Sequence, residues 1–253
     1  MTIFVVVPAY NEAKRIRIPD WERITAIDNV QIVFVNDFST DATHEILSQI
    51  PHATTVSTPR NLGKAGAVKF GMEFTIRELL QSTDDWIGFL DADSAFGIED
   101  IGRICQLTQV PKFDQFAGIW ASRVKMLGRN IERNEIRHYI SRLIITYLSY
   151  GMREFPYDSQ AGFKLFRSQY LTSTIESLQI KTRWFVDLEL WLHIKKNVGD
   201  SFKIWEEPVF YWREVEESRI RVRNFLAIAK EVYSIKKLLT LSVITPDKGM
   251  KRG

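Results

Sequence analysis

Two aspartates that stand two positions apart, Asp91 and Asp93, directly follow a short apolar run. The run at 86–90 is typical of a buried strand, so both carboxylates are expected at the carboxyl end of that strand. Burying two charges there without a cation is costly. Carboxylate oxygens are the ligands that Mg²⁺ and Mn²⁺ prefer, and either ion would also hold the phosphates of a nucleotide. We therefore predict a metal site at Asp91 and Asp93, and the alternative is a pair of solvated loop acids.

Further polar motifs follow other apolar runs. Asp37 comes after the run at 31–35 and is suited to accept hydrogen bonds from a ribose or a base edge, whereas Asp41 is expected to cap the next helix. A glycine-containing turn at 60–66 places Lys64 at the start of a helix. This turn lacks the spacing of a P-loop, so an ordinary turn remains the alternative to a phosphate-binding loop.

The elements that must position these residues alternate along the first third of the chain. The apolar runs at 3–7, 31–35, 53–56 and 86–90 predict strands, and the segments at 41–49 and 66–81 predict helices. Such alternation indicates an α/β fold, with a Rossmann-like, mostly parallel central sheet flanked by helices. Ligands of these sheets bind beyond the carboxyl ends of the strands, where the polar motifs stand.

Two later segments have the periodicity of amphipathic helices. Between 135 and 150 the apolar residues recur with helical spacing, flanked by Arg137 and Arg142; they are Ile136, Tyr139, Ile140, Leu143, Ile144, Tyr147 and Leu148. A C-terminal amphipathic helix is predicted at 220–244, followed by a frayed tail, with one side formed by Phe225, Leu226, Ala229, Val232 and Tyr233. An apolar stripe edged with cations can lie in a membrane interface, and the alternative is that it covers the core.

Composition restricts the class of protein. The 253 residues include 34 Lys and Arg against 31 Asp and Glu, and a formal net charge of +3 predicts no nucleic-acid partner. The lone Cys105 excludes an internal disulfide framework and favours a cytoplasmic setting. The longest apolar runs are shorter than the ~20 residues of a membrane-spanning helix. We accordingly expect no signal peptide and no membrane span.

Taken together, five motifs resemble the inverting family 2 glycosyltransferases, in particular the polyprenyl-phosphate hexose synthases. The motifs lie at 8–12, 35–43, 61–64, 91–93 and 158–166, and the resemblance covers about the first 220 residues. It implies a GT-A fold, a nucleotide-sugar donor, Mg²⁺ or Mn²⁺ at Asp91 and Asp93, and a polyprenyl or dolichyl phosphate acceptor. It also implies a GT-A catalytic domain at 1–215, with a nucleotide-sugar-binding half at 1–93 and an acceptor half at 94–215, before the C-terminal helix and tail at 216–253.

The resemblance also implies roles for individual residues of this sequence. Those implied at the nucleotide sugar are Pro8, Tyr10, Glu12, Asp37, Lys64, Asp91, Ala92, Asp93 and Arg213. Those implied at the acceptor phosphate are Arg123, Arg133 and Arg137, and those at the hexose are Asp158, Gln160, Asp187 and Glu189. The catalytic group would comprise Asp91, Asp93, Arg123, Arg133 and Asp187.

Three departures from the family pattern concern the donor. Ala95 stands where mannose synthases usually carry a glutamine, and it favours the glucosyltransferase branch, as does the stretch 158–166. Arg213 resembles a basic residue of the mannose synthases, and Glu217 stands near a position where both branches expect a glycine. The resemblance thus favours UDP-glucose and leaves GDP-mannose as the alternative.

Three hypotheses follow from these observations. In the first, the chain rests on the cytoplasmic face of a membrane, by itself or through a membrane-anchoring protein partner, and transfers a hexose to a lipid phosphate. That nucleophile has a second pKa of about 6 and needs cationic clamping by arginines more than a base. In the second, the acceptor is a glycan hydroxyl, with Asp187 or Asp158 as the base. In the third, the protein is a non-catalytic nucleotide-sugar-binding scaffold.

Overall fold

The structure, a computed structural model, describes residues 1–152, 154–178, 181–182, 185–199, 202–214 and 225–244. The first half contains β1 (Ile3–Ala9), α1 (Ile18–Thr25), β2 (Val30–Asn36), α2 (Thr43–Leu47), β3 (Ala53–Ser57), α3 (Gly63–Phe74), β4 (Trp86–Leu90) and α4 (Ile98–Leu107). The second half contains β5 (Gly118–Ser122), β6 (Asn130–Glu132), α5 (Glu135–Ser149), β7 (Phe163–Arg167), α6 (Ser168–Ile175), α7 (Val186–Val198), β8 (Ile204–Pro208), β9 (Tyr211–Arg213) and α8 (Phe225–Ile244).

A seven-stranded sheet forms the centre of the molecule, with the strand order β3-β2-β1-β4-β7-β5-β8. All neighbouring strands are parallel except at β7, which runs antiparallel to both β4 and β5. The register pairs Leu90 at the end of β4 with Phe163 at the start of β7. The loop that precedes β7 therefore lies at the same edge of the sheet as the carboxyl ends of β1, β2 and β4. The predicted mostly parallel α/β sheet is confirmed.

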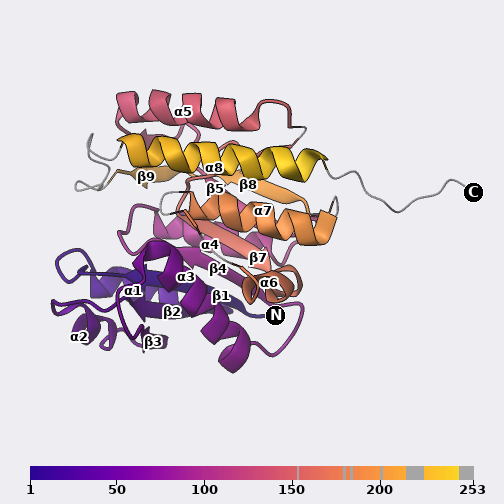
Figure 1. The fold of residues 1–253 in the computed structure, drawn as a ribbon. Coiled ribbons are helices and arrows are strands. Elements are labelled where there is room, and N and C mark those ends of the chain that lie inside the picture. Colours follow the sequence, from indigo (N-terminus) through magenta and orange to yellow (C-terminus); the bar gives the residue numbers. More distant parts are fainter. Residues whose placement is uncertain (153, 179–180, 183–184, 200–201, 215–224, 245–253) are drawn as a thin grey trace, which may run out of the picture.

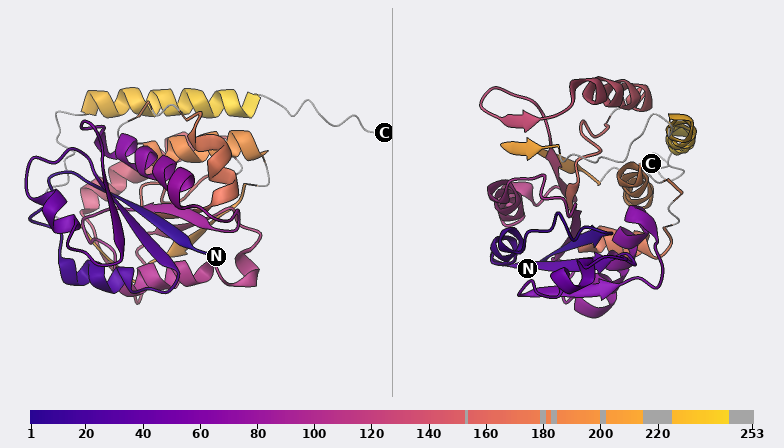
Figure 2. Two further views of the ribbon diagram at one scale, coloured as in Figure 1. Left: turned by 90° about the horizontal axis from the view of Figure 1, so that it is seen from below. Right: turned by 90° about the vertical axis from the view of Figure 1, so that its left-hand side faces the viewer.

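Helices cover both faces of this sheet, as the right-hand view of Figure 2 shows. Alternate residues of β1 face opposite sides, so that Ile3 and Val5 lie in one buried cluster and Phe4 and Val6 in the other. The first cluster is completed by α1, α2 and α4, and the second by α3, α6 and α7. Burial on both faces explains why these strands are continuous apolar runs.

The four strands expected in the first third are present with nearly the predicted bounds. The helix predicted at 41–49 is shorter, and the one predicted at 66–81 begins at Gly63 and ends in a π-helical turn, Thr75–Leu79. The helix α1 was not predicted because it has only eight residues; Pro19 lies in its first turn, and Trp21 anchors it to the core.

Two outer helices lie above the sheet, and Figure 1 shows α8 between α5 and α7. The Nζ atom of Lys236 on α8 donates hydrogen bonds to the carbonyl oxygens of Leu148 and Tyr150 at 3.2 and 2.9 Å. The predicted apolar side of α8 was partly wrong, because Tyr233 is exposed, whereas Ile235 and Leu239 are buried. Phe225 and Leu226, like the predicted tail, lie outside the side chains that the structure describes.

The apolar stripe of α5 faces outward for most of its length. Ile136 and Leu143 are 72% and 71% exposed, and Tyr139, Ile140 and Tyr147 are also exposed. Only the end of the helix reaches the core, through Ile145 and Leu148. Among the described helices, none is both long and apolar enough to cross a bilayer.

The close packing of α3 on the sheet leads to a first prediction. A Cβ atom on Gly71 would lie 2.4 Å from a methyl carbon of Val6 and 2.6 Å from one of Val35. We expect Gly71→Ala to lower the free energy of unfolding by about 1–3 kcal/mol, measured as a fall in Tm of several degrees. Gly102→Ala is the matched control, because a Cβ atom there meets nothing nearer than 3.9 Å. Equal Tm values for the two variants would contradict this packing.

Candidate active site

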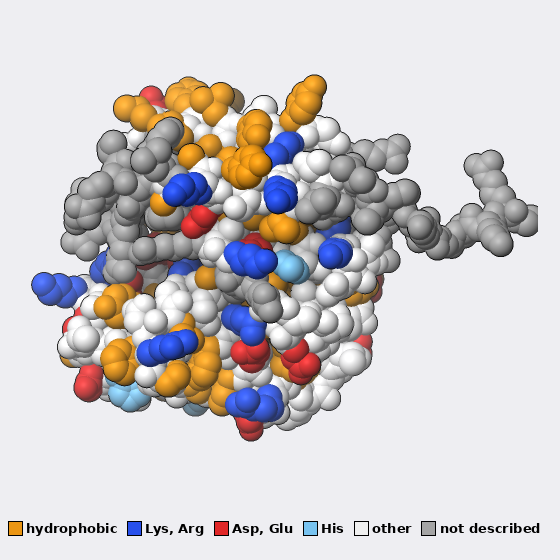
Figure 3. All heavy atoms as spheres, in the orientation of Figure 1, with side chains coloured by type: hydrophobic (Ala, Val, Ile, Leu, Met, Phe, Trp, Pro, Cys, Tyr) orange, Lys and Arg blue, Asp and Glu red, His pale blue; other side chains and the backbone are white. Residues whose placement is uncertain are grey.

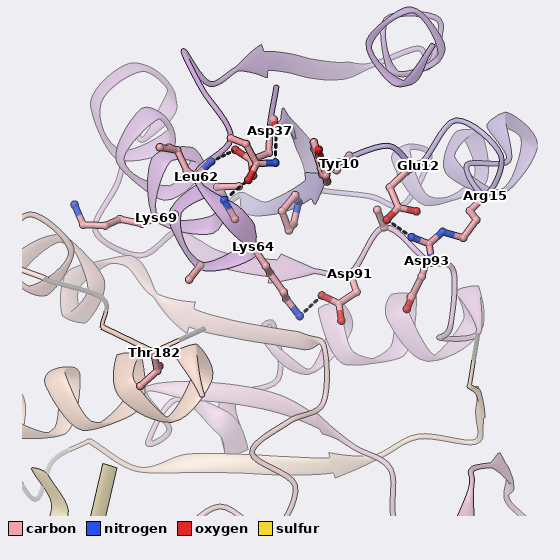
Figure 4. A pocket seen from close by; sticks show the side chains of 18 of the residues that line it. Tyr10, Glu12, Arg15, Asp37, Leu62, Lys64, Lys69, Asp91, Asp93 and Thr182 are labelled. Atoms are coloured by element: carbon pink, nitrogen blue, oxygen red, sulfur yellow. Dashed lines mark hydrogen bonds and ion pairs between the residues drawn. The ribbon is translucent and has the colours of Figure 1, made fainter. Parts of the chain in front are cut away.

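A cavity of about 1000 Å³ opens at the carboxyl ends of β1, β2 and β4 (Figure 4). Segments from the first strands and the start of α3 form most of its wall, and Leu178, Lys181 and Thr182 complete it from the second half of the chain. Eight of the nine residues predicted at the nucleotide sugar line this cavity, namely Pro8, Tyr10, Glu12, Asp37, Lys64, Asp91, Ala92 and Asp93.

Asp37 organises the loop that carries Lys64. Its two carboxylate oxygens accept hydrogen bonds from the backbone N–H groups of Leu62 and Gly63 at 2.7 and 2.8 Å. The hydroxyl of Thr58 donates to the same carboxylate at 3.0 Å. Gly63 has φ of +72°, a conformation that glycine adopts without strain. Asp37 therefore holds the turn that starts α3, in addition to lining the cavity.

The prediction that Asp41 caps the helix was wrong, because the N-cap of α2 is Ala42 and no side chain caps it. The carboxylate of Asp41 instead accepts hydrogen bonds from the backbone N–H and the hydroxyl of Thr43, the first residue of α2. The hydroxyl oxygen of Thr43 in turn accepts the backbone N–H of Glu12 at 2.8 Å. This contact fixes the start of the loop after β1, where the carboxylate of Glu12 pairs with Arg15.

Lys64 and Asp91 point toward each other in the cavity, as Figure 4 shows, with 2.5 Å between Nζ and Oδ1. Burial alone would lower the pKa of Lys64, but the charges of Asp91, Asp187 and Asp93 outweigh that effect and raise it. Burial, reinforced by the charge of Asp91, raises the pKa of Asp93 to about 6. The two aspartates thus form a crowded anionic site beside Lys64.

The approach of another loop to Asp91 requires a glycine. The backbone N–H of Asp91 donates to the carbonyl of Gly162 at 2.9 Å. A Cβ atom on Gly162 would overlap the carboxylate of Asp91, so a larger residue would displace that side chain from its position. The segment 158–162 consequently packs directly against the metal-site candidate.

The residues present fit a divalent cation. Within the described residues, no three His, Cys, Asp or Glu side chains are grouped around a common metal position. Asp91 and Asp93 would therefore supply two ligands, and phosphate oxygens and water would supply the others, as is usual for Mg²⁺. The raised pKa of Asp93 shows the repulsion between the carboxylates that a cation would relieve.

Arg123 and Asp158, predicted at the acceptor and at the hexose, bind each other. The Nε and Nη2 atoms of Arg123 donate to the two oxygens of Asp158 at 2.8 and 2.7 Å. Burial would raise the pKa of Asp158, but the Arg123 guanidinium holds it well below its usual range. Arg123 also lies over the ring of Trp212, at 4.9 Å from the centroid. Its positive charge is therefore fixed in place.

Further arginines lie around this pair. Burial and the nearby charge of Arg123 lower the pKa of Arg133, and the charge of Arg142 acts in the same direction. Arg142 on α5 donates to the carbonyl of Tyr157 at 2.7 Å. These three arginines make a local cationic region. Arg137 belongs to α5, but its side chain lies outside those that the structure describes.

The predicted hexose residues occupy different surroundings. Glu189 is buried, and its carboxylate accepts the backbone N–H groups of Lys181 and Thr182 at 2.9 to 3.0 Å, so it anchors that segment of the cavity wall. Asp187 is buried near Lys64 and Arg123, whose pKa values its charge raises. The buried Nε2 atom of Gln160 makes no hydrogen bond within the described residues.

Arg213 does not line this first cavity, unlike the other residues predicted at the nucleotide sugar. It is exposed on β9 and borders a second cavity of about 420 Å³, which shares Asp91 with the first and also includes Ala95. Its backbone N–H donates to the carbonyl of Ala95 at 3.1 Å.

Sequence reasoning assigned no role to two residues that support the site. The carboxylate of Glu206 on β8 accepts the backbone N–H groups of Tyr157 and Asp158 at 2.7 and 2.8 Å, and nothing in its sequence neighbourhood signals this. Lys164 lies among the apolar residues Phe163, Leu165 and Phe166 of β7, and that interruption of the pattern was a detectable signal.

The comparisons with known proteins agree with this architecture. The family described as Glycosyl transferase family 2 matches residues 4–171, more than half of the chain. The dolichyl-phosphate beta-glucosyltransferase ALG5A of Trichomonas vaginalis is 28% identical over 91% of this chain and 72% of its own length. The human dolichyl-phosphate beta-glucosyltransferase is 27% identical over 85% of this chain and 68% of its own length.

Solved structures share the GT-A fold. Glucosyl-3-phosphoglycerate synthase from Mycobacterium tuberculosis, in complex with Mn²⁺, UDP and glucosyl-3-phosphoglycerate, has a TM-score of 0.63 at 18% identity. The match covers 98% of this chain and 82% of that one. A mannosyltransferase from Pyrobaculum calidifontis, in complex with GDP-Man and Mn²⁺, has a TM-score of 0.56 at 14% identity and covers 96% and 70% of the two chains.

The hydrogen bonds of Asp37 lead to a second prediction. Asp37→Asn replaces one acceptor oxygen by an N–H₂ group that faces a backbone donor, so we expect a loss of about 1–3 kcal/mol in the free energy of unfolding. Nucleotide affinity should fall with it, because the loop carrying Lys64 loses its anchor. Chemical denaturation and calorimetric titration measure the two effects. Asp28→Asn, at an exposed position, is the control and should behave as the wild type.

Proposed function

The chain belongs to glycosyl transferase family 2, and we propose that it is an inverting enzyme that transfers a hexose from a nucleotide sugar to a polyprenyl phosphate. The observation that carries the proposal is one short segment, 158–162, that joins two charged regions. At one end Gly162 packs on Asp91 in the donor cavity, and at the other Asp158 holds Arg123 in the cationic region. Inverting transfer needs the nucleophile in line with the leaving group, on the opposite face of the reacting sugar carbon, so the two regions would bind on either side of the hexose.

The donor proposed is UDP-glucose. The cavity is large enough for a nucleotide sugar, since ligand pockets usually measure about 300–1,000 Å³. Two of the similar proteins are named as dolichyl-phosphate beta-glucosyltransferases, and this supports glucose as the hexose. Asp37 and Tyr10 lie on the side of the first strands, where we place the nucleoside, and Lys64 lies where the diphosphate would meet Asp91.

We propose that Mg²⁺ or Mn²⁺ binds Asp91 and Asp93 together with the diphosphate. Such an ion neutralises charge that develops on the leaving group. Lys64 would contribute a further positive charge to the same phosphates, and Glu12 with Arg15 would border them. Two of the structural neighbours were solved in complex with Mn²⁺, and this supports a divalent cation at the site.

The acceptor proposed is a lipid phosphate that acts as its own nucleophile. A phosphate monoester is largely dianionic at neutral pH and needs no general base. Arg123 and Arg133 would bind its oxygens, and Arg142 would add to the positive field. Because Asp158 already neutralises part of the charge of Arg123, we assign the larger share of phosphate binding to Arg133. Asp187 would bind hydroxyl groups of the hexose.

We further propose that α5 rests on the membrane that contains the acceptor. Its outward apolar side chains are continued by the exposed Tyr150 and Tyr233, and tyrosine is enriched at membrane interfaces. In Figure 3 orange side chains gather along the upper edge of the molecule, where α5 lies, with blue Lys and Arg side chains beneath them. Lys236 on α8 lies over the ring of Tyr147 on α5 and adds a cation beside the apolar face. Cations beside an apolar face suit anionic lipid headgroups.

The compartment proposed is the cytoplasmic face of that membrane. Cys105 is buried on α4 and burial raises the pKa of its thiol to about 12, so it is a packing residue suited to a reducing setting.

A transfer assay tests the reaction. With UDP-glucose, a short-chain polyprenyl phosphate and Mn²⁺, the wild type should form glucosyl-phosphoprenol, and Asp93→Asn should lower the rate at least about 100-fold because a metal ligand is lost. Asp84→Asn, at an exposed position, should keep the wild-type rate. Full activity of Asp93→Asn would contradict the metal site, and a wild type inactive with UDP-glucose and GDP-mannose alike would favour the scaffold hypothesis.

Vesicle binding tests the membrane face. Leu143→Glu should weaken co-sedimentation with vesicles that contain anionic lipid by about tenfold, because a leucine side chain contributes about 1.5–3 kcal/mol when buried. Gln49→Glu makes the same change of charge at an exposed position on the far side of the sheet and should bind as the wild type does. The assignment of α5 fails if both variants sediment equally.

A further inference from the structure

Lys164 of β7 occupies a fully buried position whose neighbours in the sheet carry apolar side chains. Phe163 and Leu165 face one buried cluster, and Phe166 faces the other. Lys164 faces the same side as Phe166, between the rings of Phe89 and Trp120 on the neighbouring strands, and is 0% exposed. Removing an ammonium group from water costs several kcal/mol unless its partners compensate.

The buried ammonium has two polar partners. Its Nζ atom donates to the carbonyl oxygen of Ala161 and lies 3.4 Å from Oδ1 of Asp187. Burial lowers the pKa of Lys164, and the charges of Asp187 and Asp158 oppose that effect. Oδ1 of Asp187 accepts no hydrogen bond from the described residues, so the ion pair with Lys164 is the contact that compensates its charge among them.

Stability does not account for this arrangement. Replacing a buried ion pair by apolar side chains of similar volume is often neutral or stabilising. A methionine at 164 would fill the space between Phe89 and Trp120, as the surrounding apolar cluster favours. The buried charge of Lys164 is better explained by the roles of its two partners, the carbonyl of Ala161 and the carboxylate of Asp187.

Both partners belong to the candidate active site. Ala161 precedes Gly162, whose carbonyl accepts the backbone N–H of Asp91. Asp187 lies near Lys64 and Arg123, one from the donor cavity and one from the cationic region. Lys164 therefore connects two parts of the site. One is the turn at 161–162, which packs on Asp91, and the other is the carboxylate of Asp187, which is assigned to the hexose.

We propose that Lys164 is a positioning residue: its bond to the Ala161 carbonyl holds the ammonium beside Asp187, and the ammonium orients that carboxylate toward the hexose. It acts through these groups and does not touch the substrate. The inference rests on the proposed function for one point, that Asp187 contacts the hexose.

Titration calorimetry with UDP-glucose and with UDP, in the presence of Mn²⁺, tests this role without requiring turnover. Lys164→Met should lower the affinity for UDP-glucose by about tenfold, as the loss of a hydrogen bond to a charged group would, and leave the affinity for UDP within about twofold. Its Tm should fall below that of the wild type, because the Asp187 carboxylate is left buried without its cation. Asp187→Asn should show the same pattern, and the double variant should lose no more than Asp187→Asn alone, because both changes remove one interaction.

The matched control is Lys195→Met on α7. Lys195 also pairs with a carboxylate at 3.4 Å, that of Glu154, and lies 5.3 Å from the centroid of Trp191, but it has no contact with the site. Its affinities should not change. If Lys164→Met does not fold, Lys164→Gln, which keeps a donor for Ala161, is measured by the same criteria.

Three results would overturn the inference. These are unchanged affinity for UDP-glucose in the Lys164 variant, equal losses for UDP and UDP-glucose, and additive losses in the double variant. A wild type that binds GDP-mannose in place of UDP-glucose is measured with GDP-mannose and GDP. A wild type that binds the nucleotide sugar but transfers nothing to polyprenyl phosphate contradicts the proposed function, while the affinity comparison still decides the role of Lys164.

Discussion

Two carboxylates at the end of a buried strand are the constraint on which the site depends. Asp91 and Asp93 follow β4 at the centre of the sheet, where water is partly excluded and like charges repel. The structure compensates with Lys64 on one side and with the backbone of Gly162 on the other. The loop held by Asp37 places Lys64 beside Asp91. Gly162 has no side chain, which lets the segment before β7 approach Asp91.

Charge alternates outward from this centre. Asp91 pairs with Lys64, Asp187 lies beside Lys164, and Asp158 binds Arg123. The pairs of Asp187 and Asp158 are buried, so their desolvation offsets much of the attraction, but the loss of one partner would leave a buried charge uncompensated. The anionic region at Asp91 and the cationic region at Arg123 are thereby kept separate, and the short segment 158–162 contacts both.

Much of this could be predicted from the sequence, for identifiable reasons. Strands β1, β2 and β4 are mostly apolar runs, and polar motifs after such runs meet at one edge of a parallel sheet, which placed Asp37 and Asp91 together. The pairing of Arg123 with Asp158 could not be predicted, because it depends on the antiparallel direction of β7, which periodicity does not encode. The exposure of Leu143 depends on where α8 packs, and amphipathicity alone does not specify which side is covered.

The antiparallel course of β7 has a consequence for how such an enzyme could diverge. Because the strand enters the sheet between β4 and β5 at the reactive edge, the few residues before it are shared by the two substrate regions. Any shift of that segment would move Gly162 and Asp158 together, so the separation between the proposed donor and acceptor regions would be inherited as a unit. Under the proposed function, new acceptors would be accommodated by elements outside the sheet, such as α5, while that separation stays constant.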